Sequence, residues 1–128
     1  MLPLHPRTRE RLTAAGLMDR LAGIEIVTPL GYLDFLRLLA SARALLTDSG
    51  GAQKEAYVLG VPCLTLRDRT EWVETVEAGW NTLVDLDAQA ALAALERPPP
   101  PSERPGLYGG GRAGERVRDL LASYTAAR

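Results

Sequence analysis

Short apolar runs alternate with longer amphipathic stretches along most of the chain. The runs are rich in branched side chains, as strands are. They lie at residues 1–4, 24–27, 44–47, 61–66 and 82–84. Between them, apolar residues recur at helical spacing over residues 8–21, 32–42, 52–59, 72–78 and 87–96. This alternation is typical of βαβ units and predicts an α/β, Rossmann-like fold: an open parallel sheet of four or five strands with helices on both faces.

Turn residues mark the predicted boundaries. Gly16 interrupts the first helical stretch, and Gly60 and Gly79 follow the ends of two others, where a left-handed cap is expected. Asp87 is placed to cap the helix that follows it. Five of the nine prolines fall between Arg97 and Pro105, which predicts an extended connector over residues 97–106. A last helix is expected at residues 113–127.

The length of 128 residues suits one domain, residues 1–128, with a sizeable core. Fifteen basic and sixteen acidic side chains give a net charge of −1, which argues against a broad nucleic-acid surface. The sequence has no apolar stretch of transmembrane length and no signal peptide, so we expect a cytoplasmic protein without membrane contact. Cys63 is the only cysteine, which excludes an intrachain disulfide, and its apolar neighbours predict a buried thiol.

The segment from Thr47 to Ala56 carries the clearest chemistry. A strand ends, Asp48-Ser49-Gly50-Gly51 permits a tight turn, and a helix begins at once. The free N–H groups and the dipole of such a helix end bind phosphate groups. A capped turn without a ligand has the same sequence pattern, so both interpretations stay open. The spacing differs from that of a P-loop.

Glu55 lies about one helical turn beyond this loop. A carboxylate there would face the same region as Ser49 and suits two vicinal hydroxyls, such as those of a ribose. The alternative is a solvated side chain paired with Lys54 or an arginine. The residues alone favour neither interpretation.

Three segments together resemble one family. They are Pro29–Phe35, the DSGGxQKEA segment at residues 48–56, and the LRDxTEWxETxxAGxN segment at residues 66–81. In order and spacing they are similar to the C-terminal half of the non-hydrolysing UDP-N-acetylglucosamine 2-epimerases. The resemblance implies one half of a GT-B type fold. Many family members have Glu where this chain has Lys54.

The resemblance also implies a UDP site. Ser49, Gly50 and Gly51 would bind the diphosphate, and Glu55 would bind the ribose. The segment around Leu30 and Phe35 would border the uracil, although an apolar helix stripe is more often core. Residues after the fourth strand would line the same cleft: Arg67, Thr70 and Glu71.

No residue of the chain is assigned a catalytic role by the motifs themselves. His5 follows the first strand, and the matching family segment lies in the cleft between domains, but a lone histidine is more often structural. Glu71, Glu74 and Glu77 fit a solvated helix face rather than a metal cluster. We expect neither a metal nor a cofactor.

The reaction implied by the family interconverts UDP-N-acetylglucosamine and UDP-N-acetylmannosamine by elimination and re-addition of UDP. In the family the acids that move protons belong to an N-terminal domain ahead of the matched region. We therefore expect a UDP-binding chain, inactive alone, whose partners are UDP or UDP-N-acetylglucosamine and that N-terminal domain; a homodimer is a further expectation. The alternatives are a UDP-binding regulatory module and the nucleotide-binding half of a glycosyltransferase.

Overall fold

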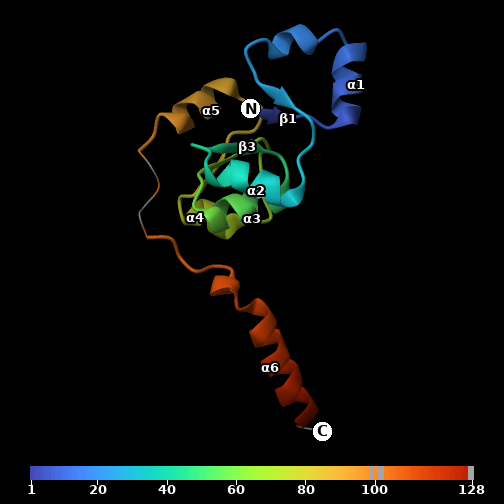
Figure 1. Ribbon diagram of the computed structural model, residues 1–128. Coiled ribbons are helices and arrows are strands. Elements are labelled where there is room, and N and C mark those ends of the chain that lie inside the picture. Colours follow the sequence, from blue (N-terminus) through green and yellow to red (C-terminus); the bar gives the residue numbers. More distant parts are fainter. Residues whose placement is uncertain (99, 101–102, 127–128) are drawn as a thin grey trace. The chain divides into compact units, whose positions relative to one another are not determined.

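The predicted strands form, each as a short segment. The computed structural model describes residues 1–98, 100 and 103–126. Its strands are β1 (Leu2–Pro3), β2 (Ile26–Val27), β3 (Leu45–Thr47), β4 (Cys63–Thr65) and β5 (Asn81–Leu83). Its α-helices are α1 (Pro6–Ala14), α2 (Tyr32–Ala40), α3 (Gly50–Leu59), α4 (Val73–Glu77), α5 (Ala88–Leu95) and α6 (Ala113–Ala126). Strands and helices alternate from β1 to α5, as the hydrophobic pattern predicts (Figure 1).

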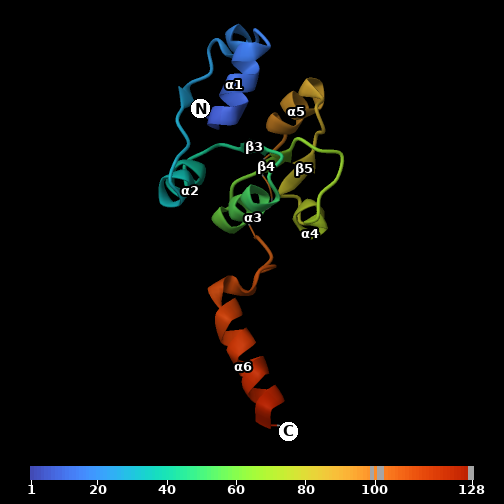
Figure 2. The same cartoon turned by 90° about the vertical axis from the view of Figure 1, so that its right-hand side faces the viewer.

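The chain divides into two compact units, residues 1–38 and 39–128. In the second unit β3, β4 and β5 form a parallel sheet in that order. Helices α3 and α4 lie on one side of this sheet and α5 on the other (Figure 2). The central strand β4 is buried at every position, which is typical of a parallel sheet covered on both faces. The apolar core of the unit consists of Leu39, Ala56, Tyr57, Val61, Cys63, Leu64 and Val84.

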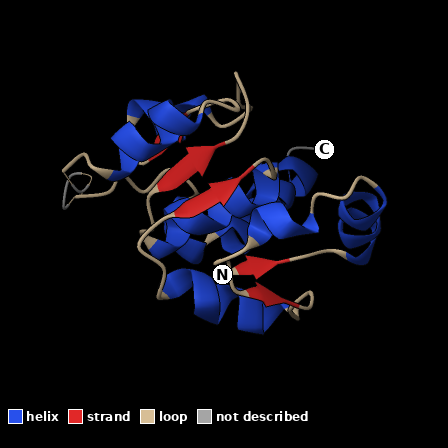
Figure 3. Ribbon diagram, turned by 90° about the horizontal axis from the view of Figure 1, so that it is seen from above, coloured by secondary structure: helices blue, strands red, loops and turns tan. Residues whose placement is uncertain are grey.

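In the first unit β1 pairs with β2, also in parallel. Each unit thus contains a parallel sheet of its own (Figure 3). The N–H groups of Leu2 and Leu4 donate to the carbonyls of Glu25 and Val27 on the β2 side. Pro3, which lies between them, has no N–H to donate.

Glycines and caps end the helices largely where expected. Gly60 and Gly79 both have φ of 74°, and the Asp87 carboxylate accepts hydrogen bonds from two N–H groups at the start of α5. Gly16, with φ of 66°, separates α1 from a short 3-10 helix at Met18–Leu21. Residues 99, 101 and 102 of the predicted connector, and residue 127 of the last helix, lie outside the described residues.

Helix α6 has an apolar stripe at helical spacing. Val117, Leu120, Leu121 and Tyr124 follow one another at intervals of three and one residues, and each is more than half exposed. A stripe of this kind is what the C-terminal sequence pattern predicts for an amphipathic helix.

Candidate functional site

The junction between β3 and α3 has the predicted strand–turn–helix geometry. Ser49 is the N-cap residue, with an extended backbone (φ −80°, ψ 120°). Its hydroxyl oxygen accepts a hydrogen bond from the N–H of Ala52 at 3.5 Å, and its own N–H donates to Thr47 Oγ1 at 3.1 Å. Helix α3 begins at Gly50, two residues earlier than predicted, so both glycines belong to its first turn.

This first turn of α3 is open. Ser49 and Gly51 are exposed and Gly50 is half-buried. The first N–H groups of a helix have no acceptor within it, and in the part of the chain that the structure describes none is found for Gly50 or Gly51. These groups and the positive end of the helix dipole are therefore available to an anionic ligand.

Gly50 lies against the loop that follows β4. A Cβ atom at this position would be 3.2 Å from Trp72 Nε1 and 3.7 Å from Glu71 Oε2. A larger residue would push the Trp72 indole away, because 3.2 Å is closer than an ordinary van der Waals contact between such atoms. Gly51 has more space, since the nearest side-chain atom to its Cβ position is Ser49 Oγ at 3.9 Å. Gly50 thus allows the loop to approach the helix start.

Glu55 follows one turn later on α3 and is half-buried. Among the described residues its carboxylate has no hydrogen-bond or ion-pair partner. The pairing with Lys54 that the sequence left open is not formed: Lys54 Nζ lies 4.2 Å from the ring centroid of Trp72 instead. The Glu55 carboxylate is therefore free to accept hydrogen bonds from a ligand.

Arg67 and Glu71 form an ion pair in the loop after β4. Arg67 Nη2 lies 3.1 Å from Glu71 Oε1, and Arg67 Nη1 lies 3.3 Å from Glu71 Oε2. A hydrogen bond from its own backbone N–H, and then the Arg67 guanidinium, lower the pKa of Glu71. The charge of Arg67 is thus balanced by Glu71 in this structure.

A buried polar network links this loop to α3. Thr70 Oγ1 donates to Gln53 Oε1 at 2.6 Å, and Asn81 Nδ2 donates to the same oxygen at 3.1 Å. Thr65 Oγ1 donates to Asn81 Oδ1 at 2.7 Å, and Asn81 Nδ2 also donates to Thr75 Oγ1 at 3.2 Å. The hydroxyl of Thr70, which we predicted at the UDP site, is therefore engaged with Gln53.

Sequence reasoning assigned no role to Gln53 or Asn81. A signal for Gln53 is present in the sequence, because Gln53, Ala56 and Tyr57 share one helix face at spacings of three and four residues. Ala56 and Tyr57 belong to the core, so a glutamine on their face is also buried, with 1% of its surface exposed. A polar side chain in that position needs hydrogen-bond partners.

The end of the proline-rich connector and the residues just after it contact α3 and α4. Tyr57 Oη donates to the carbonyl of Pro105 at 2.6 Å, and Tyr108 Oη donates to Glu74 Oε1 at 2.9 Å. Lys54 Nζ lies 4.9 Å from the Tyr108 ring centroid, so its ammonium group contacts the rings of both Tyr108 and Trp72. Burial, followed by the Glu74 carboxylate, raises the pKa of Tyr108.

His5, Leu30 and Phe35 belong to the first unit. His5 is the N-cap residue of α1, and its Nδ1 accepts a hydrogen bond from the N–H of Arg7 at 3.2 Å, which is the structural role open to it. Leu30 and Phe35 are half-buried, and Phe35 lies in α2. Their placement at a uracil ring stays a prediction.

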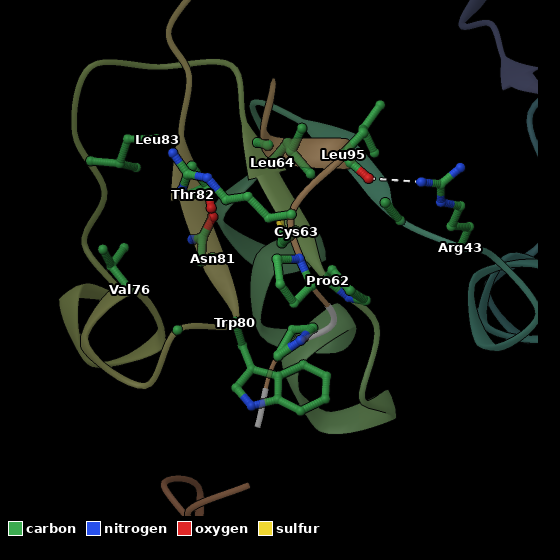
Figure 4. A pocket seen from close by; sticks show the side chains of 16 residues that line it. Arg43, Pro62, Cys63, Leu64, Val76, Trp80, Asn81, Thr82, Leu83 and Leu95 are labelled. Atoms are coloured by element: carbon green, nitrogen blue, oxygen red, sulfur yellow. Dashed lines mark hydrogen bonds between the residues drawn. The ribbon is translucent and has the colours of Figure 1, made fainter. Parts of the chain in front are cut away.

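A cavity of about 620 Å³ lies beside β4 and β5 (Figure 4). Cys63, Asn81 and Trp80 line it, and Arg43 Nη2 donates across its edge to the carbonyl of Leu95 at 2.7 Å. None of the predicted UDP-binding residues lines this cavity. Cys63 is 3% exposed, which confirms the buried thiol, and burial raises the pKa of Cys63 to about 11.

Within the described part of the chain, no group of three or more histidine, cysteine, aspartate or glutamate side chains is arranged to hold a metal ion. No described helix is both long enough and apolar enough to cross a membrane.

The parallel strands, the alternating helices and the helix start at Gly50 define an α/β protein of the Rossmann-like class. A family model described as UDP-N-acetylglucosamine 2-epimerase matches residues 1–122, and the chain belongs to this family. The family resemblance inferred from the three segments is thereby confirmed.

Curated relatives agree with this assignment. A UDP-N-acetylglucosamine 2-epimerase of Methanocaldococcus jannaschii is 44% identical over 92% of this chain and 33% of its own length. A UDP-2,3-diacetamido-2,3-dideoxy-D-glucuronate 2-epimerase of Pseudomonas aeruginosa is 43% identical over 95% of this chain and 34% of its own length. The chain therefore spans about a third of the length of the relatives it matches.

Solved structures confirm the fold class. The UDP-GlcNAc 2-epimerase of Methanocaldococcus jannaschii matches with a TM-score of 0.79 and 42% identity, over 94% of this chain and 34% of that one. The same enzyme in complex with UDP-GlcNAc and UDP matches with a TM-score of 0.75 and 42% identity, over 93% of this chain and 34% of that one. The predicted Rossmann-like half of a GT-B type fold is thus confirmed.

Proposed function

We propose that this chain is the UDP-binding part of a UDP-N-acetylglucosamine 2-epimerase. The observation that carries the proposal is the open first turn of α3, where the N–H groups of Gly50 and Gly51 have no acceptor among the described residues. Family membership supports it, as does a relative of similar structure that is in complex with UDP-GlcNAc and UDP.

In this proposal the helix start binds the diphosphate of UDP. The Gly50 and Gly51 amides and the helix dipole stabilise the negative charge that develops when the bond between the sugar C1 and the diphosphate oxygen breaks. They also keep the released UDP in position for re-addition to the glycal after the C2 proton has been removed. Glu55 is half-buried and has no partner among the described residues, and in this proposal it accepts hydrogen bonds from the two ribose hydroxyls.

Proton transfer at C2 needs a base and an acid poised over the sugar. The chain covers only a third of the length of its relatives, and we assign these groups to the part of such a protein that lies outside it. The isolated chain then binds UDP but does not interconvert UDP-N-acetylglucosamine and UDP-N-acetylmannosamine. Formation of the second sugar nucleotide by the purified 128-residue chain would contradict this part of the proposal.

The identity of the sugar is a separate matter, because the Pseudomonas aeruginosa relative is named for a diacetamido uronate and is as similar as the others. The diphosphate and ribose contacts are the same for both sugar nucleotides. UDP itself is therefore the appropriate ligand for the first test.

The test is calorimetric titration of the chain with UDP. We expect Glu55→Ala to weaken binding by about 1.5–3 kcal/mol, since a charge-assisted hydrogen bond to the ribose is lost. Glu96→Ala serves as the control, because Glu96 is an exposed carboxylate at the end of α5 and its removal changes the net charge equally. Equal affinities in the two variants would remove Glu55 from the site, and no heat of binding in the wild type would overturn the UDP assignment.

A further inference from the structure

Gln53 is a buried polar side chain in the first turn of α3, with 1% of its surface exposed. Its Oε1 accepts two hydrogen bonds, from Thr70 Oγ1 at 2.6 Å and from Asn81 Nδ2 at 3.1 Å. Its Nε2 is also buried and has no partner within the described part of the chain. An unpaired buried amide is destabilising. The Gln53 side chain therefore makes its hydrogen bonds through the acceptor oxygen Oε1.

The acceptor oxygen of Gln53 holds the loop that follows β4. Thr70 donates its hydroxyl proton to Gln53, and its oxygen accepts a hydrogen bond from the backbone N–H of Trp72 at 3.1 Å. The Trp72 indole then reaches back to the helix start, where its Nε1 is 3.2 Å from the Cβ position of Gly50. The contacts that leave α3 at Gln53 thus return to the same first turn of α3 at Gly50.

We propose that Gln53 is a positioning residue for the diphosphate site. It fastens residues 67–72 to the first turn of α3, so that the loop and the glycine amides present one fixed surface to the ligand. Preorganised donors bind better than donors that must be ordered on binding. This inference rests on the proposed UDP function, because the site that Gln53 positions is taken to bind UDP.

The same network contains a residue, Thr65, that can serve as a control because its hydrogen bond is purely structural. Thr65 is fully buried on β4, and its hydroxyl donates to Asn81 Oδ1 at 2.7 Å. This bond joins two neighbouring strands and does not involve the loop. Thr65→Val and Gln53→Met each remove buried hydrogen bonds while keeping side-chain size, so both are expected to lower stability. Only Gln53→Met releases Thr70.

The experiment is UDP titration of the 128-residue wild type, Gln53→Met and Thr65→Val, at a temperature where all three are folded by circular dichroism. We expect Gln53→Met to bind UDP about three- to tenfold more weakly. The free energy of one net hydrogen bond, which held the loop in place before binding, is then lost from UDP binding. Thr65→Val is expected to bind as the wild type does. Equal affinities in Gln53→Met and wild type, or equal losses in both variants, would overturn the proposal.

Amide hydrogen exchange over residues 67–72 separates this inference from the proposed function. In the unliganded protein, exchange there should be faster in Gln53→Met than in Thr65→Val, whether or not UDP binds; equal rates would overturn the fastening. If wild type fails to bind UDP, the proposed function fails, and with it the ligand assigned to the fastened loop. If Gln53→Met does not fold, Thr70→Val removes the same hydrogen bond from the loop side and replaces it in both measurements.

Discussion

The two compact units of the chain differ in how they are stabilised. The described residues of the range 39–128 include a strand, β4, that is buried at every position, seven buried apolar residues and a network of buried polar side chains. In residues 1–38 the one buried apolar residue is Leu4, which directly follows β1. Ile24, Tyr32 and Leu33 of that unit are all exposed by 45% or more.

The difference shows that strands can pair without forming an apolar core. Both units satisfy backbone hydrogen bonds in parallel strands, but only the second encloses apolar surface on both faces of its sheet. Because burial of apolar area supplies most of the folding free energy, the stability of the chain resides in the second unit. The candidate diphosphate site belongs to that unit as well.

The largest expected effect on stability comes from a substitution that creates a cavity in the second unit. Leu64 is 3% exposed on the central strand, and Leu64→Ala should lower the free energy of unfolding by about 3 kcal/mol. Ile24→Ala, at a residue that is 45% exposed in the first unit, should change it by less than about 0.5 kcal/mol. Denaturant unfolding followed by circular dichroism measures both, and similar losses would contradict the comparison.

An intermediate effect is expected from alkaline pH. Burial raises the pKa of the Cys63 thiol from 9.0 to about 11, so the folded state holds this proton more tightly than the unfolded state does. The contribution is complete below pH 9 and is lost as the pH rises through 11. It amounts to about 2–3 kcal/mol, from two pKa intervals at 1.36 kcal/mol each.

Cys63→Ala isolates this contribution. Tyr57 and Tyr108 also have raised pKa values, but they remain in the variant and so cancel in the difference between the two proteins. Unfolding free energies measured from pH 8 to 11 should fall more steeply in wild type than in Cys63→Ala. Parallel curves would show that the thiol is accessible to water.

The smallest expected effect concerns the contact of Lys54, on α3, with two aromatic rings. Lys54→Met keeps the apolar stem but removes the ammonium group that lies 4.2 Å from the Trp72 ring centroid and 4.9 Å from that of Tyr108. We expect a loss of about 0.5–1 kcal/mol in stability. Arg20→Met, at an exposed residue of the first unit, controls for the loss of one positive charge and should leave stability unchanged. A drop of equal size in both variants would remove the aromatic contacts from the explanation.

Most of the fold was predictable because its signals are local. Hydrophobic periodicity located the strands and the α-helices of the described residues, and Gly60, Gly79 and Asp87 end or begin helices as predicted. The order of the strands was not predicted, because hydrogen-bonded partners such as the Leu2 N–H and the Glu25 carbonyl lie far apart in the sequence.

For the candidate site, sequence reasoning placed Ser49 and both glycines at a helix start that the structure leaves open. The partners of the neighbouring side chains were not predictable, because Gln53–Thr70 and Gln53–Asn81 join residues 17 and 28 positions apart. The same holds for Lys54, which contacts Trp72 and Tyr108 across the fold instead of its neighbour Glu55. Contacts of this range follow from topology, which local patterns do not encode.

The close approach of Trp72 to Gly50 has an optical consequence. The chain contains two tryptophans, Trp72 and Trp80, and both belong to the second unit. Intrinsic fluorescence excited at the indole band therefore reports on that unit alone. One of the two emitters lies at the helix start where an anion is expected, so the unlabelled protein should respond to an arriving ligand by a change in emission.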